Sequence, residues 1–224
     1  MNLLGLDTST AASAACVLRA DGHAFEVAPA VEELTAPPAH SRDLLARAAR
    51  ALDHAGLEFG DLGAVAGGVG PGSFTGLRVG IASARALAAA HGLELHPVSS
   101  LAALAQGIGA DVRLPLIDAR RGELFAALYD AAGHELLAPF AAPPDRVVER
   151  VRRAAANPLA AGDGSLRFRE VLEAGGVRVA PGESDVHVVR ALHVCRLARN
   201  TDPVAPGAVL PDYLRAPDAA PRTT

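Results

Sequence analysis

The sequence contains no lysine, because every one of its 21 Lys and Arg residues is an arginine. This absence excludes three kinds of site that depend on a lysine amine. They are the phosphate loop of the G-x-x-x-x-G-K-[ST] type, the Schiff-base enzymes and the strand lysine of protein kinases. The chain therefore belongs to none of these classes.

Cysteine and paired histidines are also scarce. Cys16 and Cys195 are far apart and lack C-x-x-C spacing, so we expect two buried, reduced thiols rather than a disulfide framework or a zinc ribbon. The eight histidines include no pair three or four residues apart, so no helix places two imidazoles beside one metal ion. A G-x-S-x-G elbow is missing as well. We expect no metal site and no catalytic residue.

Chain length, composition and net charge exclude further classes of protein. The chain has 224 residues, of which 50% are hydrophobic and 21% charged, which is enough to fold around a sizeable core as one large domain or two small ones. A net charge of −4 argues against a stand-alone nucleic-acid binder. No basic segment precedes the apolar run that begins at Leu3, and no uncharged stretch reaches the ~20 residues of a membrane span. We expect a soluble, cytoplasmic protein.

The first half of the chain predicts a hairpin and a helix. Apolar residues 3–6 and 14–19 flank a hydroxyl-rich turn, which is typical of two antiparallel strands. Ser41 is placed to cap a helix that ends at Gly56, with Asp43 and Arg47 paired one turn apart. The apolar residues of this helix fall on one face.

A second helix is predicted from about Phe74 to His91, after a strand at 64–69, and Gly92 ends it. Small residues recur on it at every fourth position, at Gly76, Gly80, Ala84 and Ala88. Two glycines inside a helix cost roughly 1 kcal/mol each relative to alanine, so a compensating close contact is expected. Either another helix approaches this ridge, or the ridge faces the chain's own sheet.

The second half predicts a separate α/β unit. A strand at 93–98 and a short helix at 101–106 lead to the Gly-Ile-Gly segment at 107–109, which we take as the boundary between domains 1–107 and 108–224. Strands at 114–118 and 123–130 form a hairpin, and helices are predicted at 145–155 and 186–199. The proline-rich tail from about residue 201 is expected to pack back on the first domain as an extended segment.

Two segments carry the residues for binding a phosphate. Asp7, Thr8 and Ser9 follow the first strand, where an acid and hydroxyl groups can contact a nucleotide phosphate or position a metal ion. A glycine-rich turn precedes the second helix, and free amides at such a place attract anions. Its candidate residues are Gly70, Gly72 and Ser73. Ordinary tight turns have the same composition, so both readings stay open.

The turn and helix from Gly70 to Gly80, GPGSFTGLRVG, closely resemble the signature of the bacterial TsaB (YeaZ) family. Other segments agree with the family in the same order along the chain. They are GLDTS at 5–9, VSSL at 98–101, IDAR with GE at 117–123, and PDYLR at 211–215.

The resemblance implies an α/β fold of two actin-like (ASKHA, ribonuclease H-like) domains, the second reduced. It implies a non-catalytic dimerization and scaffold subunit of the complex that places threonylcarbamoyl on the adenosine beside the tRNA anticodon. The partner would be TsaD, with TsaE as a further partner and a homodimer when TsaD is absent, while tRNA is contacted only indirectly. No cofactor would be bound by this chain alone, although a nucleotide at the partner interface is compatible with the family. The H-x-x-x-H helix of TsaD is represented here by His40 only.

In the family, the helices equivalent to 41–56 and 74–91 pack against TsaD. The resemblance therefore predicts an interface formed by Leu44, Leu45, Ala48, Leu52, Gly76, Leu77, Gly80, Ile81, Ala84 and Ala88. The alternative is a stand-alone ATP-dependent phosphotransferase of the actin-like superfamily, in which Asp7 positions a metal ion and the loop at 70–73 holds phosphate.

Overall fold

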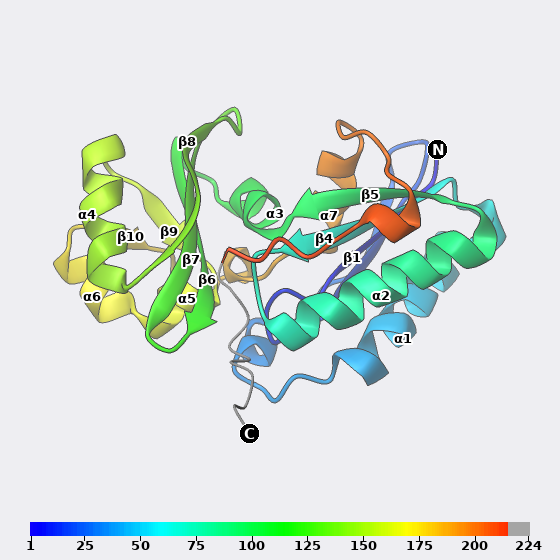
Figure 1. The fold of residues 1–224 in the computed structure, drawn as a ribbon, viewed down its shortest axis with the longest axis horizontal. Helices are drawn as coiled ribbons and strands as arrows, with labels where there is room; N and C mark the ends of the chain where they lie inside the picture. The colour runs from blue at the N-terminus through cyan, green and yellow to red at the C-terminus, as the bar shows by residue number, and fades with distance from the viewer. Residues whose placement is uncertain (215–224) are drawn as a thin grey trace, which may run out of the picture.

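The computed structural model describes residues 1–214 and consists of two α/β lobes, each built on a five-stranded sheet (Figure 1). The first sheet has the order β3-β2-β1-β4-β5, with β1, β2 and β3 antiparallel and with β4 and β5 parallel to β1. Its strands are β1 (Leu3–Asp7), β2 (Ala14–Leu18), β3 (Ala24–Val27), β4 (Ala64–Gly70) and β5 (Glu94–Ser99). The predicted hairpin of β1 and β2 is confirmed.

The helices of the first lobe cover both faces of this sheet. Side chains alternate along a strand, so Leu4 and Leu6 of β1 pack toward α1 and α2, whereas Leu3 packs toward α7. Gly5 of β1 also faces α7, and a methyl group there would come 2.7 Å from the Ala191 carbonyl oxygen. The helices are α1 (His40–Ala55), α2 (Phe74–His91), α3 (Ser100–Gly107) and α7 (Ala191–Ala198).

The structure shows which of the predicted helix caps and side-chain pairs of α1 and α2 are correct. Ser73 caps α2 by accepting a hydrogen bond from the Gly76 amide, and Gly92 follows its last residue in the left-handed conformation, as predicted. Ser41 is not the cap of α1, because that helix already begins at His40 and Ala39 precedes it. Asp43 and Arg47 are not paired with each other: Asp43 pairs with Arg42, and Arg47 with Glu33.

The second sheet has the order β10-β9-β6-β7-β8. Its central hairpin of β6 and β7 matches the prediction, whereas β8 and the two short strands were not predicted. The elements of this lobe are β6 (Val112–Arg120), β7 (Glu123–Asp130), β8 (Glu135–Ala142), α4 (Pro144–Ala154), β9 (Leu159–Ala161), α5 (Asp163–Arg167), α6 (Arg169–Ala174) and β10 (Arg178–Val179). Short 3-10 helices lie at 31–34, 59–61, 185–187 and 206–208.

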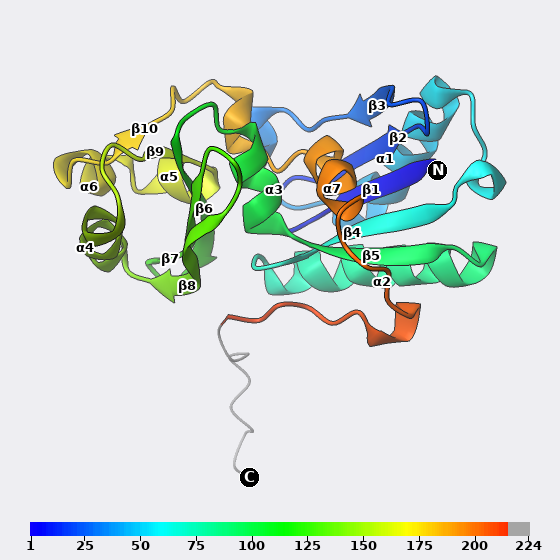
Figure 2. The same ribbon diagram turned by 90° about the horizontal axis from the view of Figure 1, so that it is seen from above.

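Helix α3 lies between the two sheets, and α7 lies beside it over the first sheet (Figure 2). Leu101 and Leu104 of α3 and Val194 of α7 share one buried cluster with residues of β4, β5, β6 and β7. Helix α7 also packs on β1 and β2, so the chain returns to the first lobe before residue 201, earlier than predicted. The helix predicted at 186–199 is shorter in the structure, where it spans Ala191–Ala198, and it packs against the first sheet.

The C-terminal segment then follows the first lobe as an extended strap. Val204 donates its amide to the Leu95 carbonyl of β5, and Asp212 donates its amide to the Val69 carbonyl of β4. Figure 1 shows this segment starting in front of β5 and running between β5 and α2 toward the second lobe before the described chain ends. The predicted packing of the tail is confirmed over its described part, and Arg215 of the PDYLR motif lies outside the described residues.

Candidate functional site

The acid at the end of β1 lies in a closed hydroxyl-rich environment. Asp7 is 2% exposed, and its Oδ1 accepts hydrogen bonds from the Ser9 amide at 2.8 Å and the Ser9 hydroxyl at 2.6 Å. Its Oδ2 accepts from the Ser100 hydroxyl at 2.7 Å. Burial raises the pKa of Asp7 above its usual 3.8, whereas the hydrogen bonds from Ser9 and Ser100 lower it. Ser100 comes from the start of α3, and sequence reasoning did not place it in this cluster.

The glycine-rich turn packs directly on the residues that follow Asp7. A methyl group at Gly72 would come 2.4 Å from the Ser9 carbonyl oxygen, and the Ser73 amide donates to that same oxygen at 2.7 Å. At Gly68, a methyl group would come 1.9 Å from Asp7 Oδ2. The turn at 70–73 therefore closes over the chain's own backbone. The Ser73 amide, which the phosphate reading needed, is used by Ser9.

His40 completes this buried cluster beneath the first turn of α2. Its Nδ1 lies 2.9 Å from the Ser13 hydroxyl, and burial lowers the pKa of His40, against the charges of Asp7 and Asp43. Burial of the His40 ring thus favours its neutral form. Among residues 1–214, no group of three or more His, Cys, Asp and Glu side chains is arranged to hold a metal ion.

The residues predicted to form a helix interface are, apart from Leu45, buried inside the first lobe. Leu44, Ala48, Leu52, Leu77, Ile81, Ala84 and Ala88 all belong to one core cluster beneath the sheet. The ridge faces inward as well: a methyl group at Gly76 would come 2.1 Å from the Thr8 carbonyl oxygen, and one at Gly80 would come 2.2 Å from Thr8 Oγ1. Of the two alternatives for the ridge, the structure therefore has the internal one, because the close contact that the glycines permit is with Thr8 in the turn after β1.

The outer face of α1 and α2 nevertheless exposes apolar side chains. Leu45 of α1 is 47% exposed and Phe74 of α2 is 41% exposed. The same two helices expose several alanines, together with the charged side chains of Arg42, Arg50 and Arg78. The exposed alanines are Ala46 and Ala49 of α1 and Ala82, Ala86, Ala89 and Ala90 of α2. We call these alanines, with Leu45 and Phe74, the outer helix face.

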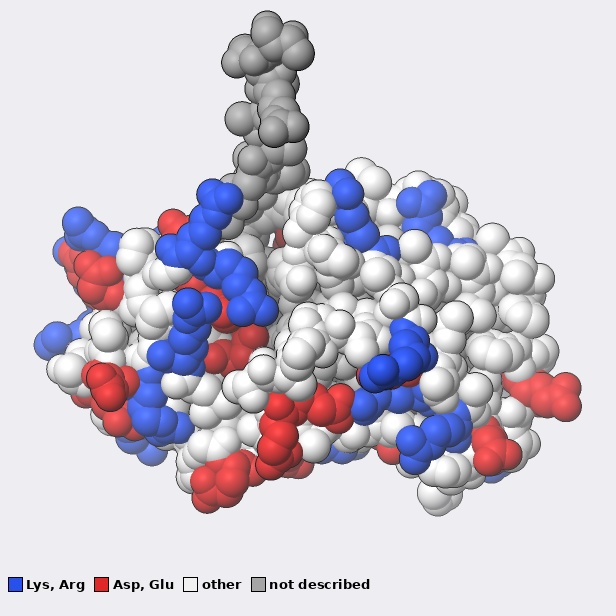
Figure 3. Space-filling view, turned by 90° about the horizontal axis from the view of Figure 1, so that it is seen from below, with Lys and Arg blue, Asp and Glu red and all other residues white. Residues whose placement is uncertain are grey.

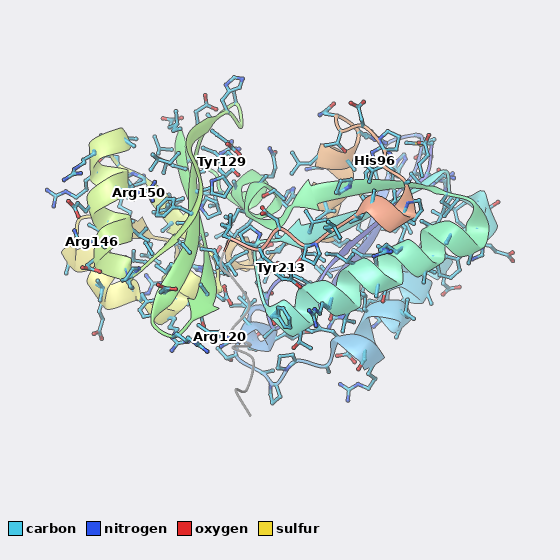
Figure 4. The ribbon with its side chains drawn as sticks, in the orientation of Figure 1. His96, Arg120, Tyr129, Arg146, Arg150 and Tyr213 are labelled. Atoms are coloured by element: carbon cyan, nitrogen blue, oxygen red, sulfur yellow. The ribbon has the colours of Figure 1, made fainter. Side chains whose placement is uncertain are left out.

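The strap lies at one end of this face. Tyr213 stacks on Phe74 with ring centroids 5.4 Å apart, and its hydroxyl accepts a hydrogen bond from Arg78 Nε at 3.2 Å. The Arg78 guanidinium also lies 3.8 Å from the centre of the Phe74 ring. Figure 4 places Tyr213 in front of the first turns of α2. The strap thus fixes the position of Phe74, one of the two large apolar side chains of the outer helix face.

Comparison with known proteins bears on the identity of the chain. Residues 32–174 match a family model described as "TsaD: tRNA N6-adenosine threonylcarbamoyltransferase". The chain is 32% identical to the tRNA threonylcarbamoyladenosine biosynthesis protein TsaB of Escherichia coli, over 82% of this chain and 80% of that protein. The chain belongs to the TsaB family.

Other relatives are similar to this chain over different fractions of its length. The chain is 27% identical to TsaB of Bacillus subtilis over 98% of its length and 96% of that protein. It is also 42% identical to an uncharacterized protein of Mycobacterium leprae, but this match spans 57% of the chain and only 35% of that longer protein.

Solved structures of TsaB-family proteins have the same fold. A Pseudomonas aeruginosa structure described as similar to peptidase YeaZ superposes with a TM-score of 0.79 and 32% identity, covering 96% of this chain and 99% of the other. A structure described as YeaZ from the same species gives a TM-score of 0.78 at 31% identity. The prediction of an actin-like α/β fold with two domains is confirmed. No helix among residues 1–214 is both long and apolar enough to cross a membrane.

Proposed function

We propose that this chain is a non-catalytic scaffold subunit in tRNA threonylcarbamoyladenosine biosynthesis, and that it docks the transferase TsaD through the outer helix face. The observation that carries the proposal is the exposure of two large apolar side chains, Leu45 and Phe74, on adjacent helices that also expose several alanines. A contiguous apolar surface on a soluble lobe usually marks a partner site. Membership of the TsaB family supplies the process in which that partner acts.

The surface suits a helical partner. Exposed alanines allow a second helix to approach closely, and Leu45 and Phe74 provide two larger side chains to be covered on docking. A stable complex typically buries about 800 Å² on each partner, which two adjacent helices of 16 and 18 residues can supply. When TsaD is absent, a second copy of this chain presents the same kind of face and would form the homodimer.

The acid cluster supports a non-catalytic role. Asp7 is the one acid of the actin-like strand-end motif, and Ser9, Ser100 and Gly68 occupy the space around its carboxylate. Serving as the metal-positioning acid of a phosphotransferase would require the Asp7 carboxylate to give up its hydrogen bonds with Ser9 and Ser100. The alternative function therefore has a direct test. ATP turnover by the purified chain that disappears in Asp7→Ala would favour the phosphotransferase over the scaffold.

A matched pair of neighbouring leucines tests the docking surface. Leu45→Asp changes the exposed residue and is expected to weaken the complex with TsaD at least tenfold while leaving the fold intact. Leu44→Asp places a charge at a site that is 0% exposed and is expected to unfold the first lobe. Titration calorimetry with TsaD measures the affinity, and circular dichroism monitors folding.

Reconstitution of tRNA modification from purified components measures the role itself. Product formation by TsaD and the other components should depend on this chain and should fall with Leu45→Asp in parallel with binding. Wild-type affinity in Leu45→Asp would reject the outer helix face as the docking surface. Full product formation without the chain would reject the scaffold role.

A further inference from the structure

The second lobe carries a charged cluster that the outer helix face does not involve. Asp118, near the end of β6, has a side chain only 5% exposed, and its Oδ2 accepts hydrogen bonds from two guanidinium groups. Arg120 Nη1 lies 3.2 Å from this oxygen, and Arg167 Nη1 lies 2.7 Å from it. Both nitrogens share one acceptor atom, so they are no further apart than the sum of these distances. The carboxylate thereby clamps two arginines side by side.

A second acid lies beneath the clamp. Asp163 is partly buried at the start of α5, where its Oδ1 accepts hydrogen bonds from the amides of Asp118 and Gly164. Burial raises the pKa of Asp163 to about 6, and the nearby Asp118 charge acts in the same direction. The low dielectric at Asp163 thus opposes its negative charge. The two guanidinium groups thus stand beside two carboxyl groups, but each arginine keeps further N–H donors besides the Nη1 that contacts Asp118.

Both arginines are open to solvent despite this clamp. Their side chains are 60% exposed at Arg120 and 47% exposed at Arg167. Arg120 sits at an irregularity in the β6–β7 register with a φ of 62°, and Asp118 Oδ1 accepts its backbone amide at 2.9 Å. A non-glycine residue in this conformation is sterically disfavoured by roughly 1 kcal/mol. The local structure thus holds Arg120 beside Asp118 rather than letting it extend freely.

A shallow hollow of about 390 Å³ lies next to the clamp, and Arg167, Phe168 and Arg169 help to line it. The Arg167 guanidinium lies 5.3 Å from the centre of the Phe168 ring. Arg169 is fixed by Glu173 at 2.9 Å and by the Ala180 carbonyl at 2.6 Å. Glu170 lines the same hollow, so this edge of the second lobe carries two arginines, one aromatic ring and one acid. Arginines beside an aromatic ring are a feature of surfaces that bind single-stranded nucleic acid.

We infer that Arg120 and Arg167 form a binding site for an RNA phosphodiester, through which this chain contacts the tRNA substrate directly. Two planar guanidinium groups held by one carboxylate oxygen can both donate to the oxygens of a phosphate group, and hydrogen bonds between charged partners are the stronger kind. The inference deepens the proposed function and rests on it, because that function supplies an RNA substrate. It also departs from the expectation that tRNA is contacted only indirectly.

The site is small, which agrees with the charge of the whole chain. A net charge of −4 excludes a broad basic surface but allows contact with one or two phosphates while another subunit supplies the rest. Figure 3 shows arginines gathered on the underside of the second lobe, beside the point where the described chain ends. Figure 4 places Arg120 at the lower end of the β6–β7 hairpin, away from Arg146 on α4.

That separation provides a matched control. Arg146 is 67% exposed and pairs with Glu149 at 2.8 Å, so Arg146→Ala removes the same charge from the same lobe at a different place. The experiment measures binding of a labelled unmodified tRNA transcript to the full-length chain by fluorescence anisotropy at salt concentrations from about 50 to 200 mM. Circular dichroism verifies that each variant folds.

Arg120→Ala and Arg167→Ala are each expected to lower the affinity about three- to tenfold at the lowest salt, and to reduce the slope of log K against log salt by about 1. Arg146→Ala should stay within about twofold of wild type. If Arg167→Ala fails to fold, Arg120→Ala, at the more exposed position, carries the test alone.

Three outcomes would overturn the inference: no binding by the wild-type chain, wild-type binding by Arg120→Ala, or an equal loss in Arg146→Ala. ATP or pyrophosphate binding that depends on Arg120, with tRNA affinity unchanged in the variant, would reassign the site to a free phosphate and overturn it as well. These results are independent of the complex with TsaD. Failure of that complex would count against the proposed function, while the binding of RNA through Arg120 would still be measured here.

Discussion

The contact between Gly80 of α2 and Thr8 gives the sharpest test of which way the small-residue ridge faces. Thr8 is fully buried, and its hydroxyl donates a hydrogen bond to the Gly76 carbonyl at 2.8 Å. A methyl group on Gly80 would come 2.2 Å from that hydroxyl oxygen. Gly80→Ala therefore forces Thr8 to move or to give up its hydrogen bond.

The magnitude follows from two opposing effects. Replacing glycine by alanine inside a helix stabilises it by about 1 kcal/mol. Overpacking costs about 1–3 kcal/mol, and loss of the buried hydrogen bond costs about 1–2 kcal/mol more. We expect Gly80→Ala to lower the free energy of unfolding by about 1–4 kcal/mol, measured by urea denaturation and circular dichroism. The larger Gly80→Leu should prevent folding of the first lobe, rather than only weaken partner binding.

A double-mutant cycle attributes the effect to Thr8. Thr8→Ala removes the hydroxyl and leaves only the Thr8 Cβ position, 3.5 Å from the new methyl group, which is an ordinary contact. In that background Gly80→Ala should be neutral or stabilising by up to about 1 kcal/mol, because the helix propensity gain remains. The reasoning is refuted if Gly80→Ala stabilises the otherwise unchanged chain, since the ridge would then have to be open.

Two further perturbations address other parts of the molecule. Asp163 has a pKa of about 6 in the folded chain against about 3.8 in the unfolded chain, so the folded state binds the proton more tightly. The free energy of unfolding therefore falls as pH rises between these two pKa values, by about 3 kcal/mol in order of magnitude. Asp163→Asn should therefore stabilise the chain at pH 8 and lose this advantage below pH 4 in urea titrations; equal stabilisation at both pH values would contradict the argument. Tyr213→Ala should lower stability by about 1 kcal/mol and expose the strap to protease, because it removes the stacking on Phe74, whereas Tyr213→Phe keeps the ring pair and should lose less. Equal protease resistance in Tyr213→Ala and wild type would show that the stacking does not hold the strap.

Local signals were sufficient where a few adjacent residues decide the conformation. The limits of α2 follow from Ser73 and Gly92, whose capping roles depend only on backbone geometry within one turn. The β6–β7 hairpin follows from two apolar runs around Gly122, which has a positive φ of 81°. Both were predicted correctly from the sequence.

Side-chain pairing and orientation were not predictable in the same way. Asp43 and Arg47 satisfy the i,i+4 rule, but Glu33, from a 3-10 helix outside α1, pairs with Arg47 instead. Likewise, a stripe of small residues has the same sequence pattern whether it packs against a partner protein or against the chain's own sheet. Only the position of Thr8 against Gly80 shows that α2 turns this stripe inward.

The pairing of Arg120 and Arg167 with Asp118 in the second lobe was not predicted for a different reason. Asp118 and Arg120 stand in a family motif, but Asp163 and Arg167 follow some 45 residues later in a segment for which no helix was predicted. A local pattern cannot show that β9 brings the start of α5 beside the end of β6. The one available signal was a predicted strand ending in Asp118, with two arginines at 120 and 121 after one intervening alanine.

The sequence by itself determined the family, the actin-like α/β fold, the limits of the principal helix and the exclusion of lysine chemistry, because each depends on residue types at short spacing. The tertiary structure alone decided that the glycine ridge is internal, that the turn at 70–73 is closed by Ser9, and that two arginines share Asp118. These features depend on contacts between residues far apart in the chain. The energy of such contacts depends on which groups the folded backbone brings together, and no local pattern of residues specifies it.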